Sequence, residues 1–362
     1  MNPKQETLLK RATLLNENPR LKKNNFDLLR LALAGIVCFV HAYQLSGYES
    51  LSFIPKILSS EAAVKGFFVA SGFLIFMSYE RSSSLLSYFS RRIRRIYPAY
   101  LTIIIIMAFG FVLISTKNAA EYFFSSEWIK YLAANLVFLN FLQPSLPGVF
   151  ESNIFTAANG ALWILKIEVM FYFSVPIIVY LFKYIPKNWV LFGGYILSII
   201  YSTAFNIIAS QTGKELFQEI GRQLPGQLCY FLAGAFFYYN LSIFEKYITY
   251  FIVSSSIALI INQFYTIHWL EPFALATLIM FFSLFLYIGE IGKYGDFSYG
   301  IYILHSPILQ IFIKYRWFSE NPWLYLLIGL LTTLILAILL WHGVEKRFLL
   351  RNSHYLSNPT RS

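Results

Sequence analysis

Residues 26–47, FDLLRLALAGIVCFVHAYQLSG, indicate the class of protein to which this chain belongs. The stretch is apolar and has the length of a membrane-spanning helix, which needs about 20 residues. Two of its side chains are unusual in such a helix: Arg30 near its start and His41 deep inside it. The rest of the sequence shows why an apolar helix would carry both.

The composition extends the membrane interpretation to the whole chain. Of 362 residues, 57% are hydrophobic, 19% are aromatic and only 13% are charged, against about 25% charged in an average soluble protein. The net charge of +11 could suggest a nucleic-acid partner, but the basic residues fall between apolar runs, where membrane topology explains them better. We therefore expect an integral membrane protein that binds lipids and no nucleic acid.

Apolar stretches of bilayer length recur along the chain and predict an all-α, polytopic membrane bundle of about ten transmembrane helices. The stretches are 28–47, 62–80, 97–115, 161–183, 189–210, 224–243, 248–266, 270–291, 296–315 and 322–342. A further stretch, 128–142, is shorter. Counting it as a crossing would put the basic C-terminus outside, against the positive-inside bias, so we predict a re-entrant or interfacial helix there.

Polar ends flank the membrane domain. Residues 1–25 are basic and lack the pattern of a cleaved signal peptide, which predicts a cytoplasmic tail. We expect one membrane domain over residues 26–348 and a second cytoplasmic tail over 349–362. Cys38 and Cys229 lie in apolar segments without metal-ligand spacing, so we expect neither a disulfide nor a metal site.

Arg30 and His41 are predicted to share one face of the first span. Eleven positions at about 100° each amount to just over three turns, with a rise of about 16 Å. Arg30 could pair with Asp27 at helical spacing, or simply extend to the membrane interface. His41 is buried more deeply, where an ionisable group normally faces a bundle interior or a wet cavity. A structural histidine bonded to a neighbouring helix is the alternative.

Glu168 is predicted to lie at the same depth as His41, in the fourth span. A carboxylate at that depth could orient the imidazole and raise its basicity. Lys65 and Lys166 are alternative partners of Glu168, which would make it part of a structural ion pair. His305, in DFSYGIYILHSP, is another ionisable residue at mid-membrane depth. Its setting fits a functional site and a core hydrogen bond equally well.

A cluster of arginines precedes the third span, in YFSRRIRRIYPAYL at residues 88–101. The cluster consists of Arg91, Arg92, Arg94 and Arg95. Cytoplasmic arginines commonly orient a membrane protein and bind anionic headgroups, but guanidinium groups also suit phosphates, and this cluster is predicted on the same side as Arg30. The sequence contains no glycine-rich phosphate loop, so a nucleotide-like ligand would be held by arginines.

Six motifs occur in the order of one known family. They are FDLLRLALAGIVCFVH, GFFVASGFLI, RRIRRIYPAYL, ALWILKIEVMFYF, SYGIYILHSP and HGVEKRF. Together they make the chain, from about residue 24 to 348, closely resemble the acyltransferase-3 family of integral-membrane O-acyltransferases. The resemblance implies transfer of an acyl group, usually acetyl from cytoplasmic acetyl-CoA, to a hydroxyl of a surface glycan such as O-antigen or exopolysaccharide.

The resemblance also implies roles for particular residues. Arg30 and His41 would form the essential pair, and Trp163 and Glu168 match the Trp and Glu of the family. In the resulting hypothesis, His41 acts as general base or acyl relay and Glu168 orients it. The phosphates of acetyl-CoA would bind four arginines: Arg30, Arg91, Arg92 and Arg95. The acceptor would be a surface or lipid-linked saccharide, the location a bacterial inner membrane with both termini cytoplasmic, and no metal is implied.

Two other classes of protein could account for part of the pattern. Buried His, Glu and Arg also mark the ion pathways of proton-coupled transporters and flippases. Those proteins often contain inverted repeats around a midplane site, and the sequence shows no such repeat. A membrane assembly subunit would explain the hydrophobicity but not ionisable residues at matching depth. The acceptor hydroxyl, the size of the acyl group and the oligomeric state are left open by the sequence.

Overall fold

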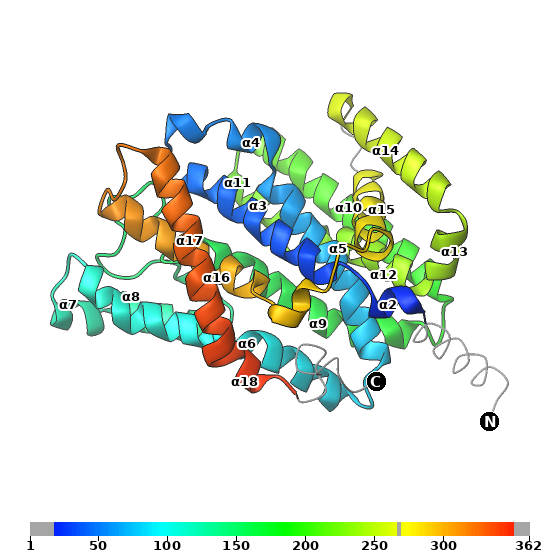
Figure 1. Cartoon of the computed structure of the whole chain (residues 1–362), viewed down its shortest axis with the longest axis horizontal. Coiled ribbons are helices and arrows are strands. Elements are labelled where there is room, and N and C mark those ends of the chain that lie inside the picture. The colour runs from blue at the N-terminus through cyan, green and yellow to red at the C-terminus, as the bar shows by residue number, and fades with distance from the viewer. Residues whose placement is uncertain (1–17, 266–268, 351–362) are drawn as a thin grey trace. The chain divides into compact units, whose positions relative to one another are not determined.

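The computed structural model describes residues 18–265 and 269–350, and all its regular elements within these ranges are helices (Figure 1). Helix accounts for 78% of the structure. The chain forms two compact units. Unit 1 comprises the described parts of residues 1–30, 65–88 and 170–293, and unit 2 those of residues 31–64, 89–169 and 294–362.

Six helical stretches are long and apolar enough to cross a membrane. They contain α3 (Phe26–Ser46), α5 (Ser60–Glu80), α6 (Leu85–Gly110), α9 (Trp163–Leu181), α10 (Lys187–Thr212) and α17 (Pro322–Leu340). Shorter helices occupy the other four predicted spans, as α12 (Leu224–Tyr239), α14 (Ile248–Phe264), α15 (Glu271–Phe285) and α16 (Ser298–Lys314). A 17-residue helix rises only about 26 Å, less than the roughly 30 Å hydrocarbon core. The all-helical membrane class is confirmed, whereas the number of crossings stays a prediction.

Short helices connect these elements. They are α2 (Pro19–Lys22), η1 (Glu49–Leu51), α4 (Ile54–Ile57), η2 (Phe111–Ile114), α7 (Ala119–Phe123), α8 (Ser126–Leu136), η3 (Asn140–Leu142), η4 (Gly160–Leu162), α11 (Glu215–Gly221), α13 (Leu241–Lys246), η5 (Ile291–Tyr294), η6 (Trp341–Glu345) and α18 (Lys346–Phe348). Helix α8 has 11 residues and a rise of about 16 Å. It is therefore shorter than a bilayer-spanning helix, and a re-entrant or interfacial position of the segment 128–142 stays a prediction.

Unit 1 is held together by close contact between α5 and α12. A Cβ atom on Gly72 would collide with the carbonyl oxygen of Phe231, and one on Gly234 would collide with the carbonyl oxygen of Val69. Small residues allow helix backbones to approach closely, which favours packing where no water drives association. The two glycines therefore set the separation of α5 and α12.

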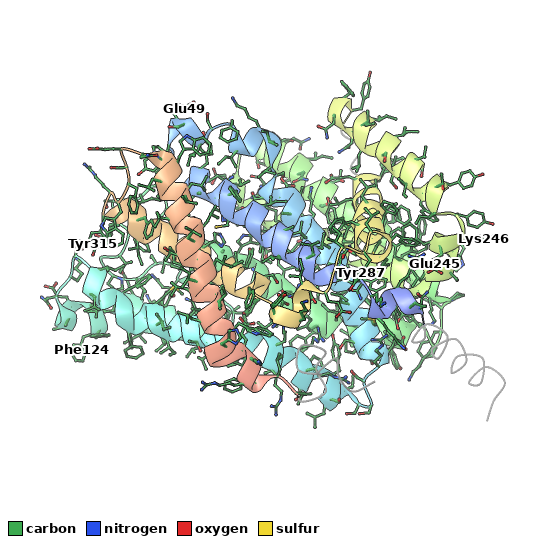
Figure 2. The ribbon with its side chains drawn as sticks, in the orientation of Figure 1. Glu49, Phe124, Glu245, Lys246, Tyr287 and Tyr315 are labelled. Atoms are coloured by element: carbon green, nitrogen blue, oxygen red, sulfur yellow. The ribbon has the colours of Figure 1, made fainter. Side chains whose placement is uncertain are left out.

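The residues just before α3 pack against α13 and α15 in unit 1. The Arg20 guanidinium donates a hydrogen bond of 3.1 Å to Glu245 (labelled in Figure 2). The same guanidinium lies 4.0 Å from the centre of the Phe285 ring. The backbone N–H of Asn25 donates to the carbonyl of Ser283 at 2.7 Å. The last residues of the segment that we assigned to a polar tail are thus folded onto α13 and α15, and the tail boundary itself stays a prediction.

Helix α16 forms the centre of unit 2 and lies beside α17 (Figure 1). Several of its polar residues are buried, with His305 at 0% and Gln310 at 1% exposure. Pro307 lies inside the helix and lacks the N–H that would pair with the carbonyl of Ile303. The side-chain amide of Asn159 donates to that carbonyl at 2.8 Å. A side chain from a distant loop therefore replaces the missing helical hydrogen bond.

Candidate active site

Two histidines meet inside unit 2, one from α3 and one from α16. Nδ1 of His41 lies 2.9 Å from Nε2 of His305, and the ring centres are 5.0 Å apart. His305 is fully buried, whereas His41 is half-buried. The sequence left the role of His305 open between a functional site and a core hydrogen bond, and the structure makes it the direct partner of His41.

The position of His305 is determined by contacts along α16. Its Nδ1 lies 3.1 Å from the carbonyl oxygen of Ile301, one turn earlier in the helix. The hydroxyl of Tyr302 donates to the carbonyl of Ala161 at 3.0 Å, which joins α16 to η4. Together with the Asn159 bond, these contacts hold the turn that carries His305 against the segment leading into α9.

Glu168 is close enough to Tyr302 for an electrostatic interaction. It lies in the second turn of α9, and its charge acts on the Tyr302 hydroxyl. The Tyr302 ring contacts the His305 ring edge-on, with ring centres 5.8 Å apart. The structure thus brings Tyr302, His305 and His41 together, and Glu168 interacts electrostatically with Tyr302. A direct role of Glu168 in orienting His41 stays a prediction.

Each of the two lysines that we considered as partners of Glu168 has a contact with another residue, and their pairing with Glu168 stays a prediction. Lys65 forms an ion pair with Glu271 at 2.7 Å, within unit 1. The ammonium group of Lys166 lies 4.4 Å from the centre of the Phe141 ring, a cation–π contact within unit 2. Both lysines are therefore stabilised by neighbours that the sequence pattern did not indicate.

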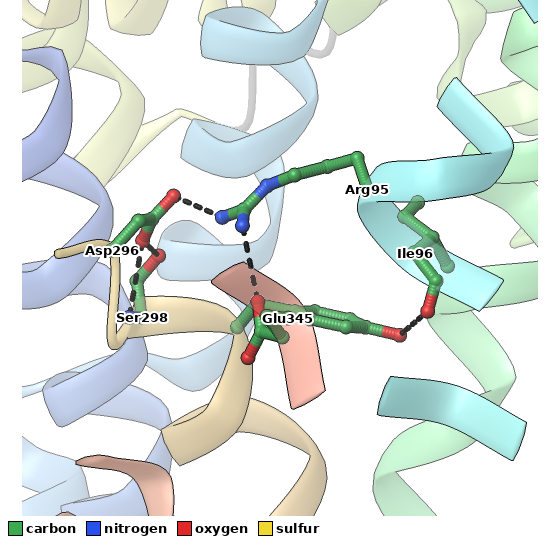
Figure 3. Close-up of polar contacts among 6 residues, drawn as sticks. Arg95, Ile96, Asp296, Ser298 and Glu345 are labelled. Atoms are coloured by element: carbon green, nitrogen blue, oxygen red, sulfur yellow. Dashed lines mark hydrogen bonds and ion pairs between the residues drawn. The ribbon is translucent and has the colours of Figure 1, made fainter. Parts of the chain in front are cut away.

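Arg95 lies between two buried carboxylates in unit 2, as Figure 3 shows. Its guanidinium donates to Glu345 at 3.0 Å and to Asp296. The side chain of Arg95 is 12% exposed and each carboxylate side chain is 1% exposed, so the whole network is shielded from solvent. Sequence reasoning placed Arg95 with the donor phosphates but indicated neither carboxylate as its partner.

The Arg95 network lies at the entrance to α16. The second oxygen of Asp296 accepts from the backbone N–H and the hydroxyl of Ser298, at the first residue of the helix. Gly295, just before, has a φ of +127°, and a Cβ atom there would collide with the Trp341 indole nitrogen. Glu345 ends η6, a five-residue π-helix, a rare geometry that often occurs at functional sites. Arg95 therefore connects α6 to the start of α16 and to η6, the π-helix that follows α17.

The remaining predicted residues lie on three of the long helices. Arg30 lies in the second turn of α3, an unbroken helix that also carries His41, and it is half-buried. Arg91 and Arg92 are half-buried in α6, and Arg91 is one turn before Arg95 on the same face. Trp163 is the half-buried first residue of α9.

The cluster around His41 is suited to proton transfer. An imidazole held by a second buried imidazole can accept a proton from a bound hydroxyl and return it to a leaving group. Within residues 18–265 and 269–350, no group of three or more His, Cys, Asp or Glu side chains is arranged to hold a metal ion.

The chain is similar to known proteins along most of its length. The family model described as "Acyltransferase domain" matches residues 23–342. A protein named "O-acetyl transferase" from Shigella phage Sf6 is 28% identical over 346 residues, which cover 93% of this chain and 99% of the phage protein. "Nodulation protein 10" from Rhizobium leguminosarum bv. viciae is 25% identical over 361 residues, covering 91% and 94%. No solved structure matches the chain.

Proposed function

Because the chain belongs to the acyltransferase-3 family and is therefore an acyltransferase, we propose that it transfers an acetyl group from acetyl-CoA to a hydroxyl of a surface or lipid-linked glycan. The contact between His41 and His305 carries this proposal, because it supplies a half-buried base that a fully buried imidazole holds in place. The similarity to a phage protein named "O-acetyl transferase" supports acetyl as the group and oxygen as the acceptor atom.

The donor binds at the arginines of α3 and α6. Arg30, Arg91 and Arg92 receive the phosphates of acetyl-CoA, because guanidinium groups form charge-assisted hydrogen bonds with phosphate oxygens. Arg95 lies in the same cluster but has a structural role. Its guanidinium is held by two carboxylates, so it anchors the start of α16. The rise of about 16 Å from Arg30 to His41 along a helix is a distance that an extended pantetheine arm can cover.

The reaction is a base-assisted acyl transfer. His41 takes the proton from the acceptor hydroxyl, the oxygen attacks the thioester carbonyl, and the carbon–sulfur bond breaks. The proton then passes from His41 to the departing CoA sulfur. A relay, in which His41 accepts the acetyl group and passes it to the hydroxyl, is the alternative route. Glu168, acting through Tyr302, stabilises the positive charge that develops on the imidazole.

The expected setting is a bacterial inner membrane, with both termini in the cytoplasm. The arginines of α6 then face the compartment that contains acetyl-CoA, in agreement with the positive-inside rule. The glycan acceptor enters from the other side or from the bilayer, still attached to its lipid carrier.

Transfer of label tests this function. Membranes containing the protein are incubated with acetyl-CoA radiolabelled in the acetyl group, and the glycan fraction is counted. The wild type transfers label, whereas His41→Ala lowers the rate by about 10²-fold or more, the usual contribution of a general base. His342→Ala changes a histidine that is exposed on η6 and serves as the matched control.

Two outcomes would contradict the proposal. Normal glycan acetylation by inserted His41→Ala or Arg30→Ala would refute the assignment of the site. Absence of label from every glycan, with a saccharide instead moved across the membrane by the wild type, would favour the transporter alternative. In the absence of acceptor, a trapped acetyl-enzyme that is lost in His41→Ala supports the relay, and its absence supports direct transfer.

A further inference from the structure

Both ring nitrogens of His305 have a partner in the structure. Nδ1 lies 3.1 Å from the carbonyl oxygen of Ile301, and Nε2 lies 2.9 Å from Nδ1 of His41. A buried neutral imidazole has one N–H donor and one acceptor nitrogen, and each needs a partner. Here the second nitrogen is directed at another imidazole, which makes the protonation of the two rings interdependent.

The chemistry of the partners determines where the hydrogens lie. A carbonyl oxygen only accepts, so Nδ1 of His305 carries the hydrogen that is shared with Ile301. A neutral imidazole has one N–H, so Nε2 of His305 has a lone pair and accepts. Nδ1 of His41 must then be the donor in the contact between the two rings. The lone pair of His41 is consequently on Nε2.

We propose that His305 is a positioning residue that holds His41 in the Nδ1–H tautomer and thereby makes Nε2 of His41 the basic nitrogen. The proposal rests on the function proposed above and adds to it the identity of the atom that receives the proton. The same logic applies where a carboxylate holds the imidazole of a serine hydrolase in one tautomer. In this protein, a neutral imidazole takes the place of the carboxylate.

The arrangement serves each stage of the transfer. When Nε2 of His41 takes the acceptor's proton, the O–H bond breaks and an N–H bond forms, while Nδ1–H of His41 remains bonded to His305. That bond becomes charge-assisted and therefore stronger as the imidazolium forms. It returns to its original state when Nε2 delivers the proton to the CoA sulfur. The hydrogen on Nδ1 of His305 stays in place throughout the transfer.

The surroundings of His305 are rigid enough for this role. Three hydrogen bonds tie α16 to residues 153–161 on both sides of His305: Tyr302 to Ala161 at 3.0 Å, Asn159 to Ile303 at 2.8 Å, and Asn153 to Gln310 at 2.8 Å. A ring held in this way keeps its acceptor nitrogen at a constant position, as a preorganised site requires.

Two substitutions at one position separate positioning from packing. His305→Gln retains an amide that can present an oxygen acceptor near the place of Nε2, whereas His305→Leu retains similar bulk without any acceptor. We expect His305→Leu to lower kcat by about 10²-fold, with the KM for acetyl-CoA changed by less than about twofold, and His305→Gln to recover at least about a tenth of the wild-type kcat. Ser306→Ala, the next buried residue of α16, controls for a general disturbance of the helix.

A spectroscopic measurement reports the tautomer independently of activity. Protein labelled with ¹⁵N-histidine is examined by solid-state NMR in lipid, with the His41 signals assigned by their loss in His41→Asn. In the wild type we expect Nδ1 of His41 to be protonated and Nε2 to be bare. In His305→Leu, and to a smaller degree in His305→Gln, both tautomers appear.

The outcomes distinguish this inference from the proposed function. A protonated Nε2 in wild-type His41, or an unchanged kcat in folded His305→Leu, would overturn the role of His305. If the expected tautomer is found but the wild type transfers no acetyl group to glycan, the positioning of His41 stands and the proposed reaction fails. If His305→Leu does not fold, His305→Gln decides: recovery of kcat with a mixed tautomer population supports the proposal, and loss of kcat with an unchanged tautomer refutes it.

Discussion

Nη1 of Arg95 lies 3.0 Å from a carboxylate oxygen of Glu345, although the two residues are 250 positions apart in the sequence. The contact joins α6 to the π-helix η6, and Asp296 binds the same guanidinium at the start of α16. Arg95 thus occupies a different environment from the exposed Arg94 of the same cluster. This difference leads to two predictions.

The first prediction concerns the stability of the Arg95 network. Arg95→Ala removes a guanidinium that binds two buried carboxylates, and breaking a buried ion pair in this way costs about 3–5 kcal/mol. We expect a clear fall in the thermal unfolding temperature of the purified protein in detergent. Arg94→Ala, at an exposed position of the same helix, should leave that temperature unchanged. Equal unfolding temperatures for the two variants would contradict the structural role of Arg95.

The second prediction concerns Arg91 as a donor ligand. Arg91→Ala removes a charge-assisted hydrogen bond to phosphate, which is worth about 1.5–3 kcal/mol. We expect the KM for acetyl-CoA to rise by about tenfold or more while the unfolding temperature stays near that of the wild type. Arg94→Ala again provides the comparison, since its Nε bonds to Ser90 on the exposed surface. An unchanged KM would show that the donor binds elsewhere.

The third prediction tests the repair of the proline break in α16. Asn159→Ala leaves the Ile303 carbonyl buried without a partner, at a cost of about 1–3 kcal/mol. Pro307→Ala restores the backbone N–H that this carbonyl lacks. A double-mutant cycle should therefore show that Asn159→Ala costs less in the Pro307→Ala background, as measured by unfolding in detergent. Strictly additive effects would mean that the two residues act independently.

The fourth prediction concerns the packing of α5 on α12. Gly72→Ala places a methyl group against the backbone of Phe231, and overpacking of this kind costs about 1–3 kcal/mol or more. Gly193→Ala adds the same methyl group within α10, where no heavy atom lies within 4 Å, so the gain in helix propensity should leave stability unchanged or raised by up to about 1 kcal/mol. Thermal unfolding of both variants measures the contrast. Similar stabilities would show that α5 and α12 lie further apart than described.

The fifth prediction addresses Glu168. If its carboxylate stabilises positive charge on the histidine pair through Tyr302, Glu168→Gln lowers kcat by about tenfold, or roughly 1.4 kcal/mol, with little change in KM. Single-turnover transfer of labelled acetyl measures the chemical step directly. Glu271→Gln is the comparison, because its carboxylate pairs with Lys65 in unit 1. A kcat that falls equally in both variants would point to a general loss of folding.

The sequence by itself determined the class of the protein and many of its helices. Runs of apolar residues with few charges can satisfy their backbone hydrogen bonds in lipid only as helices, so the membrane character and the helical positions follow from local pattern. The family motifs, and the position of Arg30 and His41 on one helical face, likewise follow from the local sequence. Helix α8 has 11 residues, in agreement with the short apolar stretch that the sequence shows at 128–142.

Only the tertiary structure decided which side chains meet. The partner of His41 is His305, 264 positions away, and the ring of Tyr302 contacts that of His305. Arg95 belongs to the same sequence motif as Arg91, yet it is neutralised by Asp296 and Glu345. The sequence shows at which depth of a helix each ionisable residue lies. Whether two such residues touch depends on how their helices are rotated relative to each other, and packing across the whole unit sets that rotation.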